Sequence, residues 1–192
     1  MRSPIIHVIA AVNRECAWLD EYRDLEKQHR GLVELSECGS PTNAIAALRK
    51  ESEIAVLDAH GYRSFGVIGN GWTISLLDDE VCFGARTAVV LGCCRTLSDP
   101  VVKGRIEAKC AGKVLMGGTG AVQSRDSRKL VRALCDDPRL SGLTGVGDAF
   151  SVLTSATDRL RASMPKWSER WSEPKPAIEA SWLGYGNSST EP

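Results

Sequence analysis

The stretch IAVLDAHGYRS, residues 54–64, contains an apolar run that is followed at once by a histidine and a glycine. A run of this kind is typical of a strand buried on both faces of a parallel sheet, and we predict a strand over 53–59. In an open parallel sheet the ligand site lies beyond the carboxyl ends of the strands. His60 and Gly61 are therefore expected where the strand stops, at the edge of the sheet that binds ligands.

The segments before this stretch alternate between the two kinds of regular structure. We predict strands over 5–12 and 31–38 and helices over 16–30 and 40–52. Ser40 is expected to cap the second helix, with Pro41 at its first helical position. Strands that alternate with helices run parallel, with the helices packed on the faces of the sheet.

The pattern continues after His60 with one interruption. Asn70-Gly71 lies between two apolar stretches, a strong signal for a small antiparallel hairpin. Further strands are predicted over 87–94 and 113–122, helices over 124–137 (capped by Ser124) and 145–164, and a loop over 137–144. The expected fold class is α/β, a three-layer α/β/α sandwich with a central, mostly parallel sheet and a hairpin after the His-Gly strand.

The composition of the chain changes near its C-terminus. Prolines and tryptophans become frequent, so we predict a linker-like segment over 165–176, a terminal edge strand over 177–186 and disorder over 187–192. Trp167 and Trp171 are expected to cover the edge of the core, and a partner-docking face is the alternative. Residues 1–192 are predicted to form one domain.

Composition and charge exclude several classes of function. The 192 residues are 43% hydrophobic and 25% charged, which is ordinary for a globular domain. Lys plus Arg (24) balances Asp plus Glu (24), so no field favours nucleic acid or a membrane surface. No apolar run is long enough to span a membrane and the N-terminus has no secretory signal, so a cytoplasmic location is expected.

Seven cysteines make an odd number without the repeated spacing of a zinc site or a disulfide framework: Cys16, Cys38, Cys82, Cys93, Cys94, Cys110 and Cys135. Most are expected to be small buried residues. The exception is the Cys93-Cys94 pair, which ends the apolar run of 87–94. No metal or other cofactor is expected.

The His60-Gly61 and Cys93-Cys94 pairs both follow predicted strands, so neighbouring strands could hold an imidazole beside a thiol. Such a pair is a nucleophile with its acid/base partner, because histidine raises the thiolate fraction and later protonates a leaving amine. Attack on a carbonyl creates an oxyanion that needs backbone N–H donors. Gly61 has no side chain to obstruct its own N–H, and the N–H of the cysteine is the natural second donor.

These residues resemble the caspase-like cysteine peptidases of clan CD, and within them the CHAT group related to separase. VLDAHGYR is similar to the family's strand ending in His-Gly, and AVVLGCCRT to the strand end that carries the nucleophile, which matches Cys94. GNGWTISLLDDE, AGKVLMGGTGAV and ASWLGYGN are similar, in this order, to the family's hairpin, its glycine-rich strand and its closing strand. The resemblance therefore covers nearly the whole chain.

The resemblance implies a cysteine endopeptidase that cleaves a protein or peptide substrate, with His60 and Cys94 as catalytic residues and the N–H groups of Gly61 and Cys94 as the oxyanion hole. A separate regulatory protein, and a role in a bacterial stress or defence response, follow by analogy. The separase branch receives a basic substrate side chain on an acidic residue, whereas this chain has Gly120-Ala121-Val122 there. Asp126 or the cluster around Asp78 is the candidate to replace it.

Two other interpretations remain open at the level of sequence, and a third is not favoured. An inactive caspase-like scaffold would bind a partner through the tryptophan-bearing C-terminal segment. A dithiol oxidoreductase would use both Cys93 and Cys94, although neighbouring cysteines bridge only through a strained ring. Gly117-Gly118-Thr119-Gly120 lacks the lysine and spacing of a phosphate-binding loop, which argues against nucleotide binding.

Overall fold

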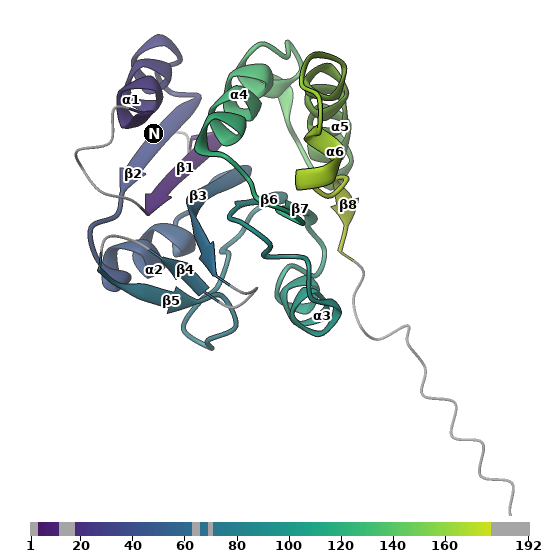
Figure 1. The fold of residues 1–192 in the computed structure, drawn as a ribbon. Coiled ribbons are helices and arrows are strands. Elements are labelled where there is room, and N and C mark those ends of the chain that lie inside the picture. The colour runs from purple at the N-terminus through teal and green to yellow at the C-terminus, as the bar shows by residue number, and fades with distance from the viewer. Residues whose placement is uncertain (1–3, 12–17, 63–65, 69–70, 178–192) are drawn as a thin grey trace, which may run out of the picture.

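The computed structural model describes residues 4–11, 18–62, 66–68 and 71–177. Its centre is a mostly parallel sheet of six strands in the order β2-β1-β3-β6-β7-β8, in which only β8 runs antiparallel to its neighbour. Helices α1, α4 and α5 cover one face, and α2 and α3 cover the other (Figure 1). The predicted α/β class with a mostly parallel sheet is confirmed.

The strands of the sheet are β1 (Ile6–Ala11), β2 (Val33–Glu37), β3 (Ile54–Tyr62), β6 (Ala88–Gly92), β7 (Val114–Gly117) and β8 (Lys175–Pro176). The helices are α1 (Trp18–Gln28), α2 (Pro41–Arg49), α3 (Pro100–Lys109), α4 (Ser124–Cys135), α5 (Val146–Ser163) and the single turn α6 (Trp167–Arg170). A small hairpin is formed by β4 (Gly66–Ile68) and β5 (Thr73–Ser75), and the predicted loop 137–144 contains a 3-10 turn at Leu140–Gly142.

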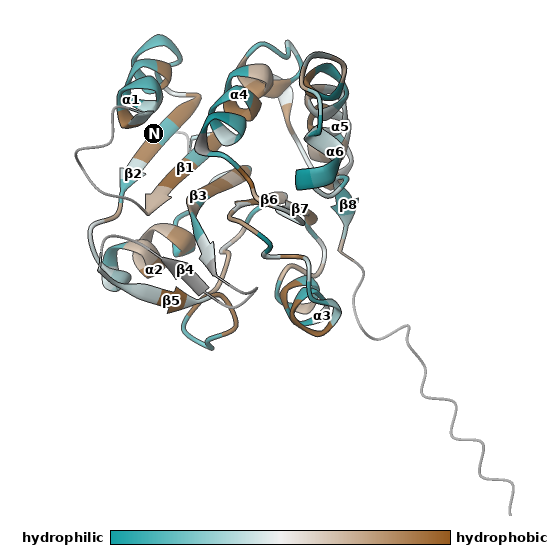
Figure 2. Cartoon of the chain, in the orientation of Figure 1, coloured by the Kyte–Doolittle hydropathy of each residue, from teal (hydrophilic) through white to brown (hydrophobic). Residues whose placement is uncertain are grey.

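Burial on both faces explains why the central strands are apolar throughout. Every residue of β1, β6 and β7 is buried, whereas only the first residue of the edge strand β2 is. Alternate residues of β3 serve different cores: Ile54 and Val56 pack towards α1, α4 and α5, and Leu57 and Ala59 pack towards α2. Figure 2 shows the hydrophobic strands enclosed by helices whose outer turns are hydrophilic.

Helices α2, α3 and α4 each begin directly after an N-terminal capping residue. The predicted cap of α2 is confirmed, because the Ser40 hydroxyl accepts the Asn43 N–H at 3.2 Å and Pro41 begins the helix. Ser124 was the wrong cap for α4: the helix begins at Ser124 itself and Gln123 is the cap, its N–H donating to the Asp126 carboxylate at 3.3 Å. Helix α3 was not predicted from the sequence; Asp99 caps it by accepting the N–H groups of Val101 and Val102.

Strand β3 does not stop at His60, contrary to the prediction of a strand over 53–59. Its neighbours in the parallel sheet end first, β1 pairing as far as Ala59 and β6 as far as Asp58. Residues 60–62 then pair antiparallel with β4, which keeps the strand extended beyond the edge of the sheet. The predicted hairpin is confirmed by the β4–β5 pairing, while Asn70 lies outside the described residues.

The segment 165–176 is not a linker. Trp167 and Trp171 are 1% and 2% exposed, belong to the core that α4 and α5 share, and stack with ring centroids 5.2 Å apart. The expectation that they cover the core is confirmed, and burial removes them as a docking face. Ala177 is described, but the rest of the predicted strand 177–186 and the predicted disorder over 187–192 lie outside the described residues. No helix among the described residues has both the length and the apolar character needed to cross a membrane.

Candidate active site

The register of the sheet brings the His60 and Cys94 backbones to neighbouring positions. β3 and β6 are adjacent and parallel, and Asp58 pairs with Gly92. Two residues further along each chain are His60 and Cys94. Both therefore lie just beyond the carboxyl edge of the parallel sheet, where such folds bind their ligands.

Glycines on both sides allow the Cys93-Cys94 backbone to be approached closely. A Cβ atom on Gly61 would lie 2.7 Å from the Cys94 nitrogen and would overlap the Cys94 carbonyl oxygen. A Cβ atom on Gly118, which directly follows β7, would overlap the Cys93 carbonyl oxygen. A side chain at either position would collide with this backbone, so Gly61 and Gly118 are needed for the close packing.

Cys94 stands in a tight turn rather than in a strand. The sequence predicted a strand to residue 94, but β6 ends at Gly92 and residues 93–98 form a turn. The Thr96 hydroxyl donates to the Cys93 carbonyl at 2.9 Å, and Arg95 adopts a left-handed φ of 55°. Strained backbone of this kind is concentrated at functional sites.

The Cys94 thiol is partly exposed and donates to the Val122 carbonyl at 3.3 Å. Val122 belongs to the loop 118–123, which joins β7 to α4. Within the part of the chain that the structure describes, no carbonyl oxygen accepts the Cys94 N–H. The thiol is held by the loop. His60 is exposed.

Among the other described cysteines, Cys38, Cys93 and Cys110 are buried, Cys135 is partly exposed like Cys94, and Cys82 is exposed. Burial raises the pKa of the Cys38 thiol to about 11 and those of Cys110 and Cys135 to about 12. Burial also raises the pKa of the Cys93 thiol, which lies in the core on the α2 and α3 side. Cys93 is fully buried, which does not favour a dithiol mechanism. Cys82 is exposed and offers a natural reference thiol.

The two acidic residues predicted to bind substrate lie in different surroundings, Asp126 being buried and Asp78 exposed. The Asp126 carboxylate is fully buried and forms an ion pair with Arg170, whose Nε lies 3.0 Å away. Asp78 lies at the opposite edge of the sheet from Cys94, because its carbonyl accepts a hydrogen bond from Lys109 at the far end of α3. Asp126 therefore offers no free carboxylate to a basic substrate side chain, whereas Asp78 is exposed but lies away from Cys94.

A buried polar pair behind the site was missed by the sequence analysis. The Asp58 carboxylate, at the last paired position of β3 with β6, accepts the Tyr22 hydroxyl of α1 at 2.8 Å. Burial raises the pKa of Asp58 to about 7, and this rise is partly offset by the Tyr22 hydroxyl and by Arg128 of α4. The only signal in the sequence was an acidic residue inside an apolar strand.

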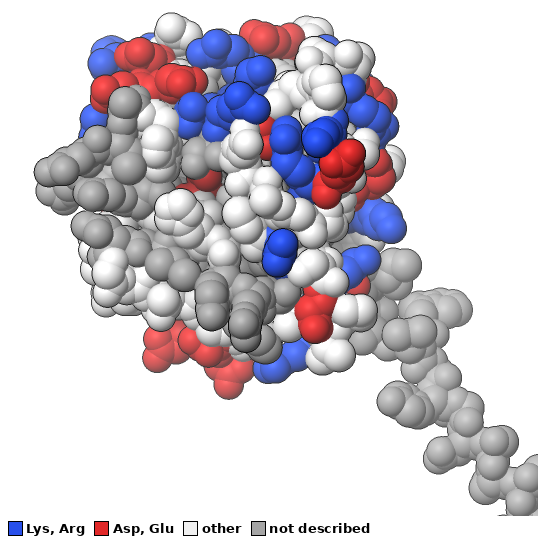
Figure 3. Space-filling model, viewed as in Figure 1, with Lys and Arg blue, Asp and Glu red and all other residues white. Residues whose placement is uncertain are grey.

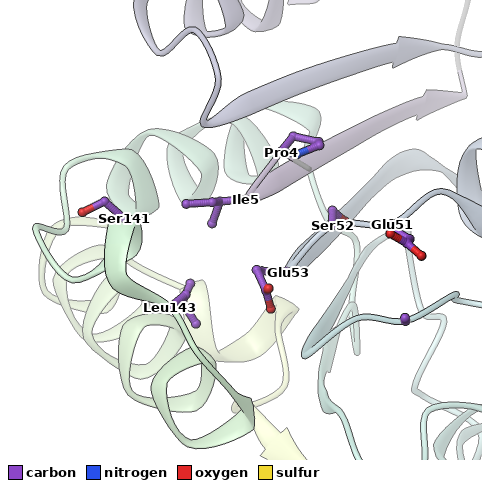
Figure 4. A pocket seen from close by; sticks show the side chains of 8 residues that line it. Pro4, Ile5, Glu51, Ser52, Glu53, Ser141 and Leu143 are labelled. Atoms are coloured by element: carbon purple, nitrogen blue, oxygen red, sulfur yellow. The ribbon is translucent and has the colours of Figure 1, made fainter. Parts of the chain in front are cut away.

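A cavity of about 310 Å³ lies far from these residues. It is lined by residues that precede β1 and β3 and by residues after α4, including Pro4, Ile5, Ser52, Glu53, Ser141 and Leu143 (Figure 4). The length of β3 separates it from His60 by roughly 20 Å. It therefore belongs to the opposite edge of the sheet and cannot receive a group that reacts at Cys94.

Surface charge and possible metal ligands add no second site. Positive and negative side chains are interspersed on the face in Figure 3, with Lys and Arg most frequent over α4, and the whole chain has a formal charge of zero. Within the described ranges, no three His, Cys, Asp or Glu side chains are grouped as metal ligands.

Comparisons with protein-family models, with curated proteins and with solved structures each find no match to this chain. The chemistry of the site therefore has to be argued from its own residues.

Proposed function

We propose that this protein is a cysteine endopeptidase of caspase-like fold, in which His60 and Cys94 form the catalytic dyad. The contact between the Gly61 and Cys94 backbones carries the proposal. It joins the strand that bears the histidine to the turn that bears the thiol, across adjacent strands of one sheet. The sheet order, the covering of both faces by helices and the hairpin after β3 are compatible with the caspase-like arrangement.

The reaction follows from the groups at this edge of the sheet. The Cys94 sulfur attacks the scissile carbonyl carbon and forms a C–S bond, and its proton passes to His60. The carbonyl oxygen becomes an oxyanion, which the N–H groups of Gly61 and Cys94 stabilise. The C–N bond then breaks and His60 gives its proton to the departing amine. Water, deprotonated by His60, hydrolyses the thioester and regenerates the thiol.

The alternative is a caspase-like scaffold without peptidase activity. It would bind a partner through the tryptophan-bearing C-terminal segment, in which Trp167 and Trp171 are buried and Trp182 lies outside the described residues. A dyad should make Cys94 more reactive than an ordinary exposed thiol, whereas a scaffold needs no such difference.

Cleavage of a diverse peptide library tests the proposal. We expect Cys94→Ala to abolish cleavage and His60→Ala to lower its rate by about 10²- to 10⁴-fold, the usual contribution of a general acid/base. Cys82→Ala, at an exposed cysteine away from the dyad, is the matched control and should cleave normally. Cleavage that persists in a folded Cys94→Ala protein would exclude Cys94 as the nucleophile.

A further inference from the structure

The loop 118–123 is fixed at both ends by one residue, Arg170. This residue ends the short helix α6, which begins at the buried Trp167. At its beginning, the N–H groups of Thr119 and Gly120 both donate to the Arg170 carbonyl, at 2.9 and 3.2 Å. Gly120 packs so closely on this segment that a Cβ atom would lie 2.6 Å from the Glu169 carbonyl oxygen. The first half of the loop is therefore held by the Arg170 backbone.

The end of the loop is held by the Arg170 side chain. Its guanidinium reaches the Asp126 carboxylate in the first turn of α4, with Nε 3.0 Å from one oxygen and Nη2 donating to the other at 3.3 Å. The same carboxylate accepts the N–H of Gln123, the last residue of the loop. Asp126 is fully buried, so the ion pair is shielded from water. Removing Arg170 would leave the buried Asp126 carboxylate without its positive partner.

Between these two anchors lies Val122, whose carbonyl accepts the Cys94 thiol. A carbonyl oxygen stabilises the protonated thiol and repels the thiolate, which is the form that attacks. The Arg95 N–H donates to the Gly120 carbonyl at 2.9 Å and ties the turn of Cys94 to the same loop. The loop is therefore hydrogen-bonded both to the Cys94 thiol and to the backbone of the next residue.

We propose that Arg170 is a positioning residue that holds the loop 118–123 against Cys94 and so restrains ionisation of the thiol. This inference rests on the proposed role of Cys94 as nucleophile. Other charged or titratable groups stand near this corner: His60 and Asp58 on β3, Tyr22 on α1, Arg95 in the turn, and Arg125, Asp126 and Arg128 on α4. The variants below leave all of them except Asp126 and Arg125 unchanged.

Alkylation by iodoacetamide, followed residue by residue by peptide mapping between pH 5.5 and 9, tests the inference without requiring peptidase activity. We expect Arg170→Ala to alkylate at Cys94 roughly five- to tenfold faster at neutral pH, the scale of one lost hydrogen-bonded restraint. The pH profile of Cys94 should move to lower pH, whereas simple loosening of the fold would raise the rate equally at every pH. Cys82 in the same molecule should react at an unchanged rate.

Two matched variants isolate the ion pair. Arg125→Ala removes a neighbouring arginine that is 61% exposed and 4.0 Å from the same carboxylate, so Cys94 should react as in the unmodified protein. Arg170→Lys keeps the positive charge and should restore most of the restraint. If Arg170→Ala fails to fold, the double variant Arg170→Ala/Asp126→Asn removes both charges together and should show the same acceleration.

An unchanged or slower rate at Cys94 in folded Arg170→Ala, or an equal acceleration at all cysteines, would overturn the inference. The same experiment with His60→Ala separates it from the proposed function. Acceleration by Arg170→Ala together with no effect of His60→Ala would support the restraint by Arg170 and contradict the dyad.

Discussion

Gly61 shows how much a single residue constrains the candidate site. Its φ angle is not left-handed, so its conformation alone does not require glycine. The requirement comes from the Cys94 backbone, which occupies the space that a Cβ atom would need. The missing side chain therefore lets the end of β3 meet the turn that carries Cys94.

We expect Gly61→Ala to destabilise the fold by about 1–3 kcal/mol, because the methyl group would meet backbone atoms that cannot rotate away. Urea denaturation measures the loss. Gly39→Ala is the control, since nothing lies within 4 Å of a Cβ atom there and its φ is not left-handed. Equal stability of the two variants would mean that Gly61 does not pack on Cys94.

The sequence predicted the position of His60, Gly61 and Cys94 at one edge of the sheet, because the His60-Gly61 and Cys93-Cys94 pairs each follow an apolar run and strand ends at one edge of a parallel sheet meet. It was misleading about Asp126. An acidic residue in the first turn of a helix is usually exposed, and the partner that buries this one, Arg170, lies 44 residues further along the chain. No local pattern signals such a pairing.

Among the elements, α3 shows where periodicity fails. Only Val102 and Ile106 are buried within its ten residues, and Gly104 interrupts it, so its apolar pattern is weak. The sequence nevertheless contains a signal for the start of α3. Asp99 is a capping residue followed by Pro100 at the first helical position, as Ser40 is followed by Pro41 in α2. The strands were predicted more easily because they are buried on both faces.

The weakness of α3 leads to a prediction at the same scale. Gly104→Ala should stabilise the protein by about 0.5–1 kcal/mol, since the position is exposed, helical and empty around a Cβ atom. Thermal denaturation should show a higher midpoint. A lower midpoint would indicate that this segment is not helical in solution.

For the molecule as a whole, the dependence of stability on pH combines two buried groups with opposite effects. Native Asp58, with a pKa near 7, keeps a proton that the unfolded chain loses near pH 4, so its contribution falls as pH rises from 4 to 7. Burial and Arg86 lower the pKa of His7 to about 4. Between pH 4 and 6.5 the unfolded chain therefore binds a proton at His7 that the native protein does not bind. That contribution rises with pH between 4 and 6.5.

These opposed slopes should be separable by substitution. Asp58→Asn removes the contribution to stability that decreases as pH rises. The free energy of unfolding of this variant should therefore increase from pH 4 to 6.5, by up to about 1.4 kcal/mol per pH unit. His7→Gln should show the reverse slope. Urea denaturation at pH 4.5 and 6.5 measures both, and slopes parallel to that of the unmodified protein would contradict the assignment.

The proposed peptidase activity of the whole molecule depends on whether Cys94 and His60 act together. The most direct measurement is brief, substoichiometric labelling with an acyloxymethyl ketone peptide probe, read by intact mass and peptide mapping, in the unmodified protein and in His60→Ala. We predict one label, on Cys94 rather than on the exposed Cys82, and its loss in His60→Ala. Labelling that favours Cys82, or that is unchanged in His60→Ala, would contradict the proposed dyad.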